Sequence, residues 1–288
     1  MKILITGETS FLGQKLINKI YNHEVLSLIR GNPLLNQKNV KYLSFSDKTI
    51  DDQIKEFKPN VFLNIASSSR LQSNSIDNYK KITDFNISTS SYLVDLAIAS
   101  GVKKIINITS NWAYLSGDDK TTDFFNYYSF TKFALDKYIA GRCRKSDCQG
   151  ISLVLYDNFD LHDPRNKIFN LFLKSFMKNI QIDFSPGNQI VNLSRMNEVV
   201  DALEFSIFND IATDQFNYYQ ITGKEISLKD LAKNMAEILN KNSSNLRFGE
   251  RPYRTGEIMK PNYYFQELPF IGKRKISLRE SLEIEISG

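Results

Sequence analysis

The sequence KILITGETSFLG occupies positions 2–13 of a 288-residue chain and joins an apolar run to a glycine-containing turn. Residues 2–6 have the composition of a strand, Gly7 ends that strand, and a helical pattern begins at Phe11. Gly13 lies in the first helical turn, and Ser10 stands where the middle glycine of the usual three is found. Glycines at such a junction allow a tight turn and a close backbone approach, so that helix amides can face a pyrophosphate. The stretch favours a dinucleotide-binding loop over a plain connector, with contacts from Gly7, Ser10, Phe11, Leu12 and Gly13.

Beyond this loop, short β-branched runs alternate with longer amphipathic stretches. The expected strands are Lys2–Thr6, Glu24–Ile29, Val40–Leu43, Val61–Ile65, Lys104–Thr109 and Ser152–Tyr156. The expected helices are Phe11–Tyr21, Ile50–Phe57, Phe85–Ser100 and Ser129–Arg144. Strand–helix alternation predicts an α/β fold, a Rossmann-type doubly wound parallel sheet with helices on both faces.

The alternation becomes less regular after about residue 165, where a helix is expected at Leu228–Leu239 and a loop at Asn240–Asn245. We therefore expect a dinucleotide-binding domain over residues 1–165, with a return segment near 190–235. Residues 166–288 are expected to form mainly a smaller α/β substrate-binding domain.

Composition limits the function classes. Hydrophobic residues make up 42% of the chain and charged residues 24%, which is enough for a sizeable core. The net charge of +5 is scattered, which suits an anionic substrate, and no basic aromatic groove indicates nucleic acid as a partner. Two cysteines and two histidines are too few for a disulfide framework or a metal site. With no apolar segment of membrane-spanning length and a strand directly at its start, the chain is expected to be cytoplasmic.

A Tyr-x-x-x-Lys pair, Tyr128 and Lys132, lies well downstream of the glycine loop. On a helix, residues four apart share one face, and a lysine ammonium beside a phenol lowers the pKa of the phenol toward working pH. Tyr127 competes with Tyr128 for this role, but only Tyr128 has a lysine four residues later. The pair predicts a proton donor for acid–base chemistry; the alternative is an ordinary interface aromatic.

The end of the second expected strand reads Leu28-Ile29-Arg30-Gly31. An acid at this position would bond a ribose 2′-hydroxyl, whereas arginine accommodates a 2′-phosphate. Arg30 thus favours NADP(H) over NAD, with NAD still possible and an exposed strand-end arginine as the plain alternative.

The order of these motifs resembles an extended short-chain dehydrogenase/reductase of the nucleotide-sugar epimerase/dehydratase group, over nearly the whole length. Further matching segments are Val61–Ala66, Asn86 with the helix after it, Lys103–Ser110, Leu161–Pro164, Asn197–Ala202 and Arg254–Glu257. Within the group, the chain is most similar to CDP-abequose and CDP-paratose synthases. Those are NADPH-dependent 4-ketoreductases that make dideoxyhexoses for surface polysaccharide, including O-antigen.

The resemblance implies roles for particular residues. Ser110 would hydrogen-bond the substrate oxygen, Tyr128 would transfer the proton, and Lys132 would anchor the nicotinamide ribose. Thr109 competes with Ser110, whose spacing to Tyr114 fits the family better. Further cofactor contacts are implied for Ala66, Ser67 and Asn86.

Dehydratases of the group carry Asp-Glu after the hydroxyl residue, but this chain has Asn111 and Trp112, which cannot shuttle protons as carboxyls do. Trp112 would wall the sugar pocket or be a partly buried aromatic. Arg254 and Arg195 are the candidate phosphate ligands, although Val191 stands where the family often has an arginine. The other substrate contacts expected are Asn111, Asp160, Asn166 and Lys167; an asparagine is usual in place of Asp160.

These features together predict an NADP-dependent oxidoreductase that reduces the C4 ketone of a nucleotide-diphospho-6-deoxy or 3,6-dideoxy hexulose. A nucleotide-sugar 4-epimerase with tightly bound NAD is the first alternative. A non-catalytic NADP-binding sensor is the second. A homodimer is expected, paired through the helices Phe85–Ser100 and Ser129–Arg144.

Overall fold

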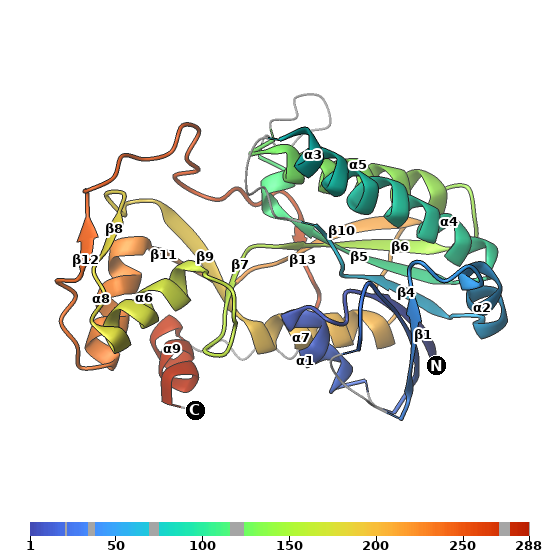
Figure 1. Ribbon diagram of the computed structural model, residues 1–288, viewed down its shortest axis with the longest axis horizontal. Coiled ribbons are helices and arrows are strands. Elements are labelled where there is room, and N and C mark those ends of the chain that lie inside the picture. Colours follow the sequence, from blue (N-terminus) through green and yellow to red (C-terminus); the bar gives the residue numbers. More distant parts are fainter. Residues whose placement is uncertain (21, 34–37, 69–74, 116–123, 271–276, 288) are drawn as a thin grey trace. The chain divides into compact units, whose positions relative to one another are not determined.

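The computed structural model describes residues 1–20, 22–33, 38–68, 75–115, 124–270 and 277–287 (Figure 1). The chain divides into two compact units. The first contains Met1–Leu155, Val200–Gln220 and Tyr264–Pro269, and the second contains Tyr156–Val199, Ile221–Tyr263 and Phe270–Gly288. Each unit therefore contains segments that are distant in sequence.

The first unit is built on an eight-stranded sheet with the order β3-β2-β1-β4-β5-β6-β10-β13. The strands are β1 (Lys2–Thr6), β2 (Glu24–Ile29), β3 (Val40–Ser44), β4 (Val61–Asn64), β5 (Lys104–Ser110), β6 (Gln149–Leu155), β10 (Phe216–Ile221) and β13 (Gln266–Glu267). The pairs from β3 to β6 are all parallel. The order reverses between β1 and β4, and ligands of such sheets bind at the carboxyl ends of the strands beside this reversal. The predicted doubly wound parallel sheet is confirmed.

Helices cover both faces of this sheet (Figure 1). They are α1 (Phe11–Ile17), α2 (Ile50–Phe57), α3 (Ile76–Thr83), α4 (Ser90–Ala99), α5 (Tyr127–Cys143) and α7 (Met196–Phe208). A π-helical turn, η1 (Asp84–Thr89), joins α3 to α4, and a short 3₁₀ turn, η2 (Asn111–Ala113), follows β5. Lys19, just after α1, forms ion pairs with Asp201 and Glu204 of α7.

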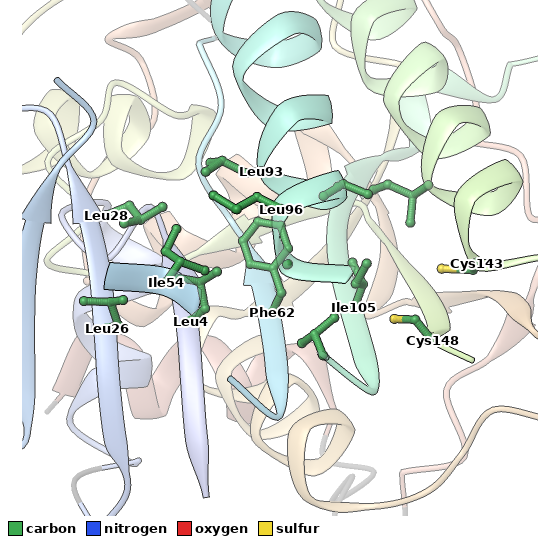
Figure 2. Close-up of a cluster of buried hydrophobic side chains, with 14 of the residues drawn as sticks. Leu4, Leu26, Leu28, Ile54, Phe62, Leu93, Leu96, Ile105, Cys143 and Cys148 are labelled. Carbon is green, nitrogen blue, oxygen red and sulfur yellow. The ribbon is translucent and has the colours of Figure 1, made fainter. Parts of the chain in front are cut away.

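One face of the sheet packs its aliphatic side chains against α2, α4 and α5 (Figure 2). Leu4, Leu26, Phe62 and Ile105 come from four adjacent strands and are at most 1% exposed. Burial of each such side chain contributes about 1.5–3 kcal/mol. The thiols of Cys143 and Cys148 lie in the same cluster, buried and unoxidised.

The second unit has two small sheets. One has the order β11-β9-β7 and the other pairs β8 with β12. Their strands are β7 (Asp157–Phe159), β8 (Ile182–Phe184), β9 (Ile190–Arg195), β11 (Lys224–Ser227) and β12 (Leu246–Phe248), and the helices are α6 (Ile168–Lys178), α8 (Leu228–Ile238) and α9 (Leu278–Ser287). Phe159, Phe172 and Met235 form the centre of its core.

Most expected elements of the first unit are confirmed to within a few residues, with three corrections. The first helix ends at Ile17, earlier than predicted, with Asn18 as its C-cap. The helix expected from Phe85 is preceded by α3, whose N-cap is Ser75, and the polar sequence of α3 conceals it. β6 begins at Gln149 and ends before Tyr156. The helix and loop predicted at 228–245 are confirmed.

Candidate active site

The glycine loop joins β1 to α1 through two close backbone contacts. Gly7 has a φ of +84°, and a Cβ on it would lie 2.5 Å from the amide nitrogen of Ala66. A Cβ on Gly13 would lie 2.1 Å from the carbonyl oxygen of Gly7. No side chain fits at either position, so the loop presents bare backbone at the carboxyl end of β1. This is the kind of cradle that a pyrophosphate needs, and the first-turn amides of Phe11 and Leu12 belong to it.

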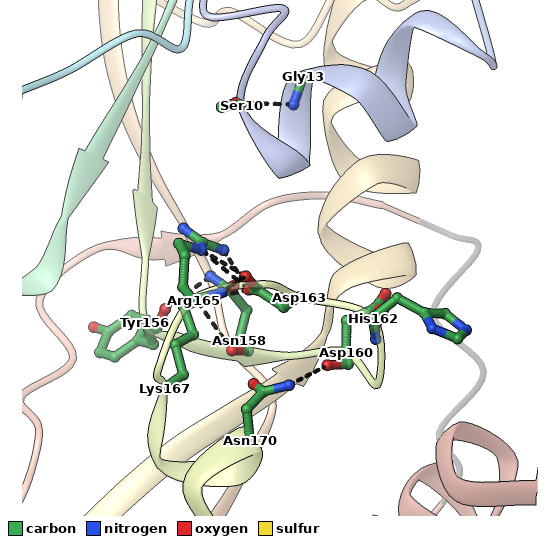
Figure 3. A network of polar contacts seen from close by, with 10 residues as sticks. All are labelled: Ser10, Gly13, Tyr156, Asn158, Asp160, His162, Asp163, Arg165, Lys167 and Asn170. Atoms are coloured by element: carbon green, nitrogen blue, oxygen red, sulfur yellow. Dashed lines mark hydrogen bonds and ion pairs between the residues drawn. The ribbon is translucent and has the colours of Figure 1, made fainter. Parts of the chain in front are cut away.

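Ser10 replaces the usual middle glycine because its backbone needs no glycine. Its φ of −76° and ψ of 158° are ordinary extended values. Its Oγ accepts a hydrogen bond from the Gly13 N–H at 3.1 Å, which makes Ser10 the N-cap of α1 (Figure 3). A serine at this position therefore adds a side chain to the loop and fixes the residue at which α1 begins.

Glu8, inside the loop, was missed by the sequence interpretation. Its side chain is fully buried, and neither carboxylate oxygen has a hydrogen-bond partner among the described residues. Burial raises the pKa of the Glu8 carboxyl, because the charged form loses its hydration. The visible signal was an acidic residue directly after Gly7, within the loop.

Arg30 follows β2 and is exposed, with its guanidinium carbon 4.8 Å from the centre of the Phe85 ring. A guanidinium stacked on an aromatic face is held by cation–π attraction. Arg30 is therefore positioned at the carboxyl end of β2, on the strand next to the glycine loop.

Asn86 lies in the π-helical turn and is 1% exposed. Its Oδ1 accepts from the Ser68 N–H at 2.7 Å, and its Nδ2 donates to the Ser68 carbonyl and to Thr131 Oγ1, both at 3.0 Å. Asn86 thus fixes the loop after β4, which carries Ala66 and Ser67, to helix α5. Single π turns inside helices are frequent at functional sites.

Ser110 is the last residue of β5, and its Oγ accepts the Trp112 N–H at 3.3 Å. Successive strand residues face opposite sides, and Thr109 is 2% exposed, whereas Ser110 is half-buried. Ser110 is thus the more accessible hydroxyl of the two. Asn111 is also half-buried, and Trp112 packs against Phe125 with ring centres 4.7 Å apart.

Tyr127 and Tyr128 have different surroundings at the start of α5. The Tyr127 hydroxyl lies 2.6 Å from Thr83 Oγ1, and its ring stacks on Tyr79 at 4.3 Å. Tyr127 is therefore engaged with α3. Tyr128 lies on the helix face that it shares with Lys132, as the spacing predicts.

Lys132 is 2% exposed, and its ammonium makes no hydrogen bond to any residue that the structure describes. Burial lowers the pKa of Lys132 to about 8, with partial compensation by the charge of Asp136. A buried ammonium with unused donors is costly in isolation and marks a place where a ligand supplies the acceptors.

The first unit contains all of the main candidate residues, at the carboxyl side of its parallel strands. They are the glycine loop, Arg30, Ser110, Tyr128 and Lys132. The backbone cradle at Gly7 and Gly13 fits a dinucleotide. So does the buried ammonium of Lys132, which has no hydrogen bond within the described ranges. Among the described residues, no group of three or more His, Cys, Asp and Glu side chains could hold a metal. No helix in the same described ranges is long and apolar enough to cross a membrane.

The remaining predicted substrate contacts belong to the second unit. Figure 3 shows Asp160 and Lys167 among them. Asp160 is 1% exposed, and its Oδ1 accepts the His162 N–H at 2.9 Å. Lys167 Nζ donates to the Asn158 carbonyl at 3.1 Å and lies 3.9 Å from Asp163. Burial lowers the pKa of Lys167 to about 8. Asn166 is exposed at the end of this loop.

The two candidate phosphate ligands differ. Arg195 Nη2 lies 3.4 Å from Glu285 of α9, so its charge is already compensated inside the unit. Arg254 is exposed, and in the described part of the chain its side chain forms no ion pair. Arg254 is accordingly the better placed of the two to meet an added anion.

Comparison with known proteins agrees with this architecture. A model of the NAD dependent epimerase/dehydratase family matches residues 3–217. The CDP-abequose synthase of Yersinia pseudotuberculosis is 22% identical over 281 residues, which is 96% of each chain. The UDP-glucose 4-epimerase of Thermotoga maritima is 18% identical with a TM-score of 0.79, covering 100% of this chain and 98% of that one. A dTDP-glucose 4,6-dehydratase of Streptomyces venezuelae, solved with NAD, is 15% identical with a TM-score of 0.81 and coverages of 100% and 96%. At 18% and 15% identity, the two solved structures show that this chain has the same fold as they do.

Proposed function

Given that this chain belongs to the NAD dependent epimerase/dehydratase family, we propose that it is an NADP-dependent oxidoreductase that reduces the C4 ketone of a nucleotide-diphospho sugar. The sugar is a 6-deoxy or 3,6-dideoxy hexulose. The observation that carries the proposal is Lys132, an ammonium 2% exposed and without a hydrogen bond among the described residues, one helical turn after Tyr128.

The residues of the first unit suit the binding of a dinucleotide. The backbone around Gly7 and Gly13 would receive the pyrophosphate, and Arg30 would meet a 2′-phosphate on the adenosine ribose. Lys132 would donate to the hydroxyls of the nicotinamide ribose. A bound reduced nicotinamide supplies hydride chemistry at this position.

The protein's own part in the reaction is to hold and protonate the carbonyl oxygen. Ser110 Oγ would donate a hydrogen bond to that oxygen and orient it. Tyr128 would give its proton to the developing alkoxide, and the Lys132 ammonium would keep the phenol pKa near working pH. Asn111 and Trp112 carry no carboxyl, which disfavours the elimination of water that a dehydratase performs.

The proposed substrate class is supported by the CDP-abequose synthase relative and by residues of the second unit. The relative that is 22% identical is a CDP-abequose synthase, which supports CDP-linked sugars as the first candidates. The proposed destination of the product is surface polysaccharide such as O-antigen. Arg254 would bind a phosphate of the nucleotide, with Lys167 and Asn166 near the sugar. The enzyme would work in the cytoplasm as a homodimer.

The first test offers purified protein NADPH or NADH together with CDP-, dTDP-, GDP- and UDP-linked 4-keto-6-deoxy sugars. Loss of the reduced cofactor with one sugar and a preference for NADPH support the proposal and identify the base. No consumption, together with NAD retained by the purified protein, would favour a nucleotide-sugar 4-epimerase instead. No consumption and no bound nucleotide would favour a non-catalytic sensor.

Tyr128→Phe is the decisive variant, with Tyr127→Phe as its matched control. Loss of the proton donor should lower kcat by about 10²–10⁴-fold with little change in cofactor binding. Tyr127 is bonded to Thr83, so its variant should lose some stability and keep kcat within a few-fold. Full turnover by Tyr128→Phe would exclude the proposed mechanism.

A further inference from the structure

A ladder of buried polar side chains crosses the middle of the main sheet. It runs from Thr6 on β1 through Asn64 on β4 and Asn107 on β5 to Asp136 on α5, and each residue is at most 1% exposed. The Thr6 hydroxyl donates to Asn64 Oδ1 at 2.7 Å, Asn64 Nδ2 to Asn107 Oδ1 at 2.8 Å, and Asn107 Nδ2 to Asp136 Oδ1 at 2.7 Å. All four residues belong to the first unit.

The direction of every bond in the ladder follows from Asp136. An ionised carboxylate only accepts hydrogen bonds, so Asn107 must turn its amino group toward it and its carbonyl toward Asn64. Asn64 must then turn its own carbonyl to Thr6. Aligned hydrogen bonds of this kind polarise one another. The ladder is thus ordered to stabilise negative charge at one end.

Two further donors meet the same carboxylate. Tyr114 donates its hydroxyl proton to Asp136 Oδ2 at 2.6 Å, and the Ser152 hydroxyl donates to Oδ1. Three donors, from β5, from β6 and from the residue after η2, therefore surround a group that is 0% exposed. Burial of a charged carboxylate is costly unless the group is both hydrogen-bonded and paired with an opposite charge.

Lys132 supplies the positive charge, one helical turn before Asp136. In the described part of the chain the two make no direct ion pair, so Asp136 acts on Lys132 through its charge alone. Burial lowers the pKa of Lys132, and the charge of Asp136 raises it against that trend. Without Asp136, the desolvated lysine would lose its proton at a lower pH.

Other described groups packed around this pair carry no competing charge. Asn107 on β5, Ser152 on β6 and Asn86 on η1 are uncharged. Tyr114 remains a neutral phenol, because burial raises its pKa far above the ordinary value and Asp136 raises it further. On α4, Asp95 is bonded to Arg142 and Tyr138 of α5 and is half exposed.

We propose that Asp136 is a positioning residue of the active site: its ladder-held carboxylate keeps the buried Lys132 ammonium charged, so that Lys132 can act on Tyr128 and on the cofactor ribose. This role rests on the proposed function for its benefit to the reaction. The charge coupling itself does not, and it can be measured in protein without cofactor.

The first experiment is a double-mutant cycle of unfolding free energies with Asp136→Asn, Lys132→Met and the double variant. At about pH 6.5, where Lys132 is charged, the coupling should change the unfolding constant at least tenfold, about 1.4 kcal/mol. At about pH 10 the lysine is neutral in the folded protein, and the coupling should then change the unfolding constant by less than about twofold. A coupling that is absent at the lower pH, or equal at both, would overturn the proposal.

The same measurements also show how the free energy of unfolding depends on pH. The folded pKa of Lys132, about 8, lies below the unfolded value of 10.5, so its titration makes the protein more stable as pH rises from about 8 to 10.5. In Asp136→Asn this rise should begin at a lower pH. Ser152→Ala removes one donor but keeps the charge, so its profile should start where that of the wild type does. An unshifted start in Asp136→Asn would contradict the role.

Asp136→Asn could also fail to fold, and the double variant then decides the question. If the unbalanced lysine charge is the cause, Lys132→Met added to Asp136→Asn restores folding. If only the ladder is the cause, it does not, and the proposal fails.

Binding of NADPH, followed by its fluorescence, separates this inference from the proposed function. Between about pH 6 and pH 8, the Kd of Asp136→Asn should rise at least about tenfold relative to wild type, with Ser152→Ala unchanged. A protein that shows the stability coupling but binds no dinucleotide would refute the proposed function and leave the Asp136–Lys132 coupling standing.

Discussion

Ser10 shows how one residue can depart from a motif without loss of the structure that the motif describes. Its position needs extended backbone, which serine adopts freely, and its hydroxyl caps α1. Gly7 and Gly13 have no such freedom, because a Cβ on either would meet backbone atoms. The sequence pattern treats the three positions alike, but the structure distinguishes two required glycines from one cap.

Ser10→Ala should lower the free energy of unfolding by about 1 kcal/mol, because the Gly13 amide loses its acceptor. Ser10→Gly should cost only a few tenths of a kcal/mol. Urea unfolding of the two variants measures both changes. Equal losses would show that the hydroxyl is not acting as the cap.

Arg30 is a second single residue with a role that can be tested, the binding of a 2′-phosphate. Arg30→Ala should weaken NADPH binding by about 10–100-fold, since a charge-assisted bond to the 2′-phosphate contributes about 1.5–3 kcal/mol. NADH has no such phosphate and should bind as before. Fluorescence titration with both cofactors measures the change.

Arg144 on the exposed end of α5 provides the control for charge, and Arg144→Ala should affect neither cofactor. Phe85→Leu removes the ring under Arg30 and should weaken NADPH binding by a smaller factor. Equal losses for NADPH and NADH in Arg30→Ala would contradict the assignment of Arg30 to the phosphate.

At the scale of elements, the π-helical turn between α3 and α4 places Asn86 where a regular helix would not. The extra residue in the turn lets one amide reach both the loop after β4 and Thr131 on α5. Three elements of the candidate site therefore depend on a single side chain.

Asn86→Ala should destabilise the protein by about 2 kcal/mol, because the buried Thr131 hydroxyl and the partly buried backbone groups of Ser68 lose their partners. Dinucleotide affinity should fall as well, since the loop carrying Ala66 and Ser67 loses its brace. Ser88→Ala, exposed in the same turn, should change the unfolding free energy by less than about 0.5 kcal/mol. Chemical unfolding compares the two, and similar losses would remove the special role of Asn86.

Prediction from sequence succeeded where periodicity is strong and failed where contacts are distant. Strands β1–β6 are rich in β-branched and other apolar residues, and all six were located to within a few residues. β10 and β13 complete the same sheet from positions beyond residue 215, which local patterns cannot reveal. The buried ladder was also missed, because Asn64 and Asn107 interrupt apolar runs without showing which partners they meet.

For the whole molecule, the predicted homodimer through α4 and α5 remains a testable expectation. Phe130 on α5 is 37% exposed, although it is large and apolar. Phe130→Glu should shift the mass in solution from twice 33.2 kDa toward 33.2 kDa, because a charge cannot be buried there without a partner. Light scattering after size exclusion measures this mass.

Met177 on α6 is 63% exposed in the second unit and gives the matched control. Met177→Glu should leave the mass unchanged. A monomeric wild type, or an equal response to both substitutions, would exclude an interface centred on α5.

The sheet of the first unit draws its last two strands from residues 216–221 and 266–267, after long excursions into the second unit. On a translating ribosome, β6 would emerge more than sixty residues before β10, its neighbour in the sheet. At about 5–20 residues per second, the nascent sheet would wait roughly 3–13 seconds with an unpaired edge. Such an edge invites pairing with other chains, so yield in the cell should depend on chaperones and on slow, low-temperature expression.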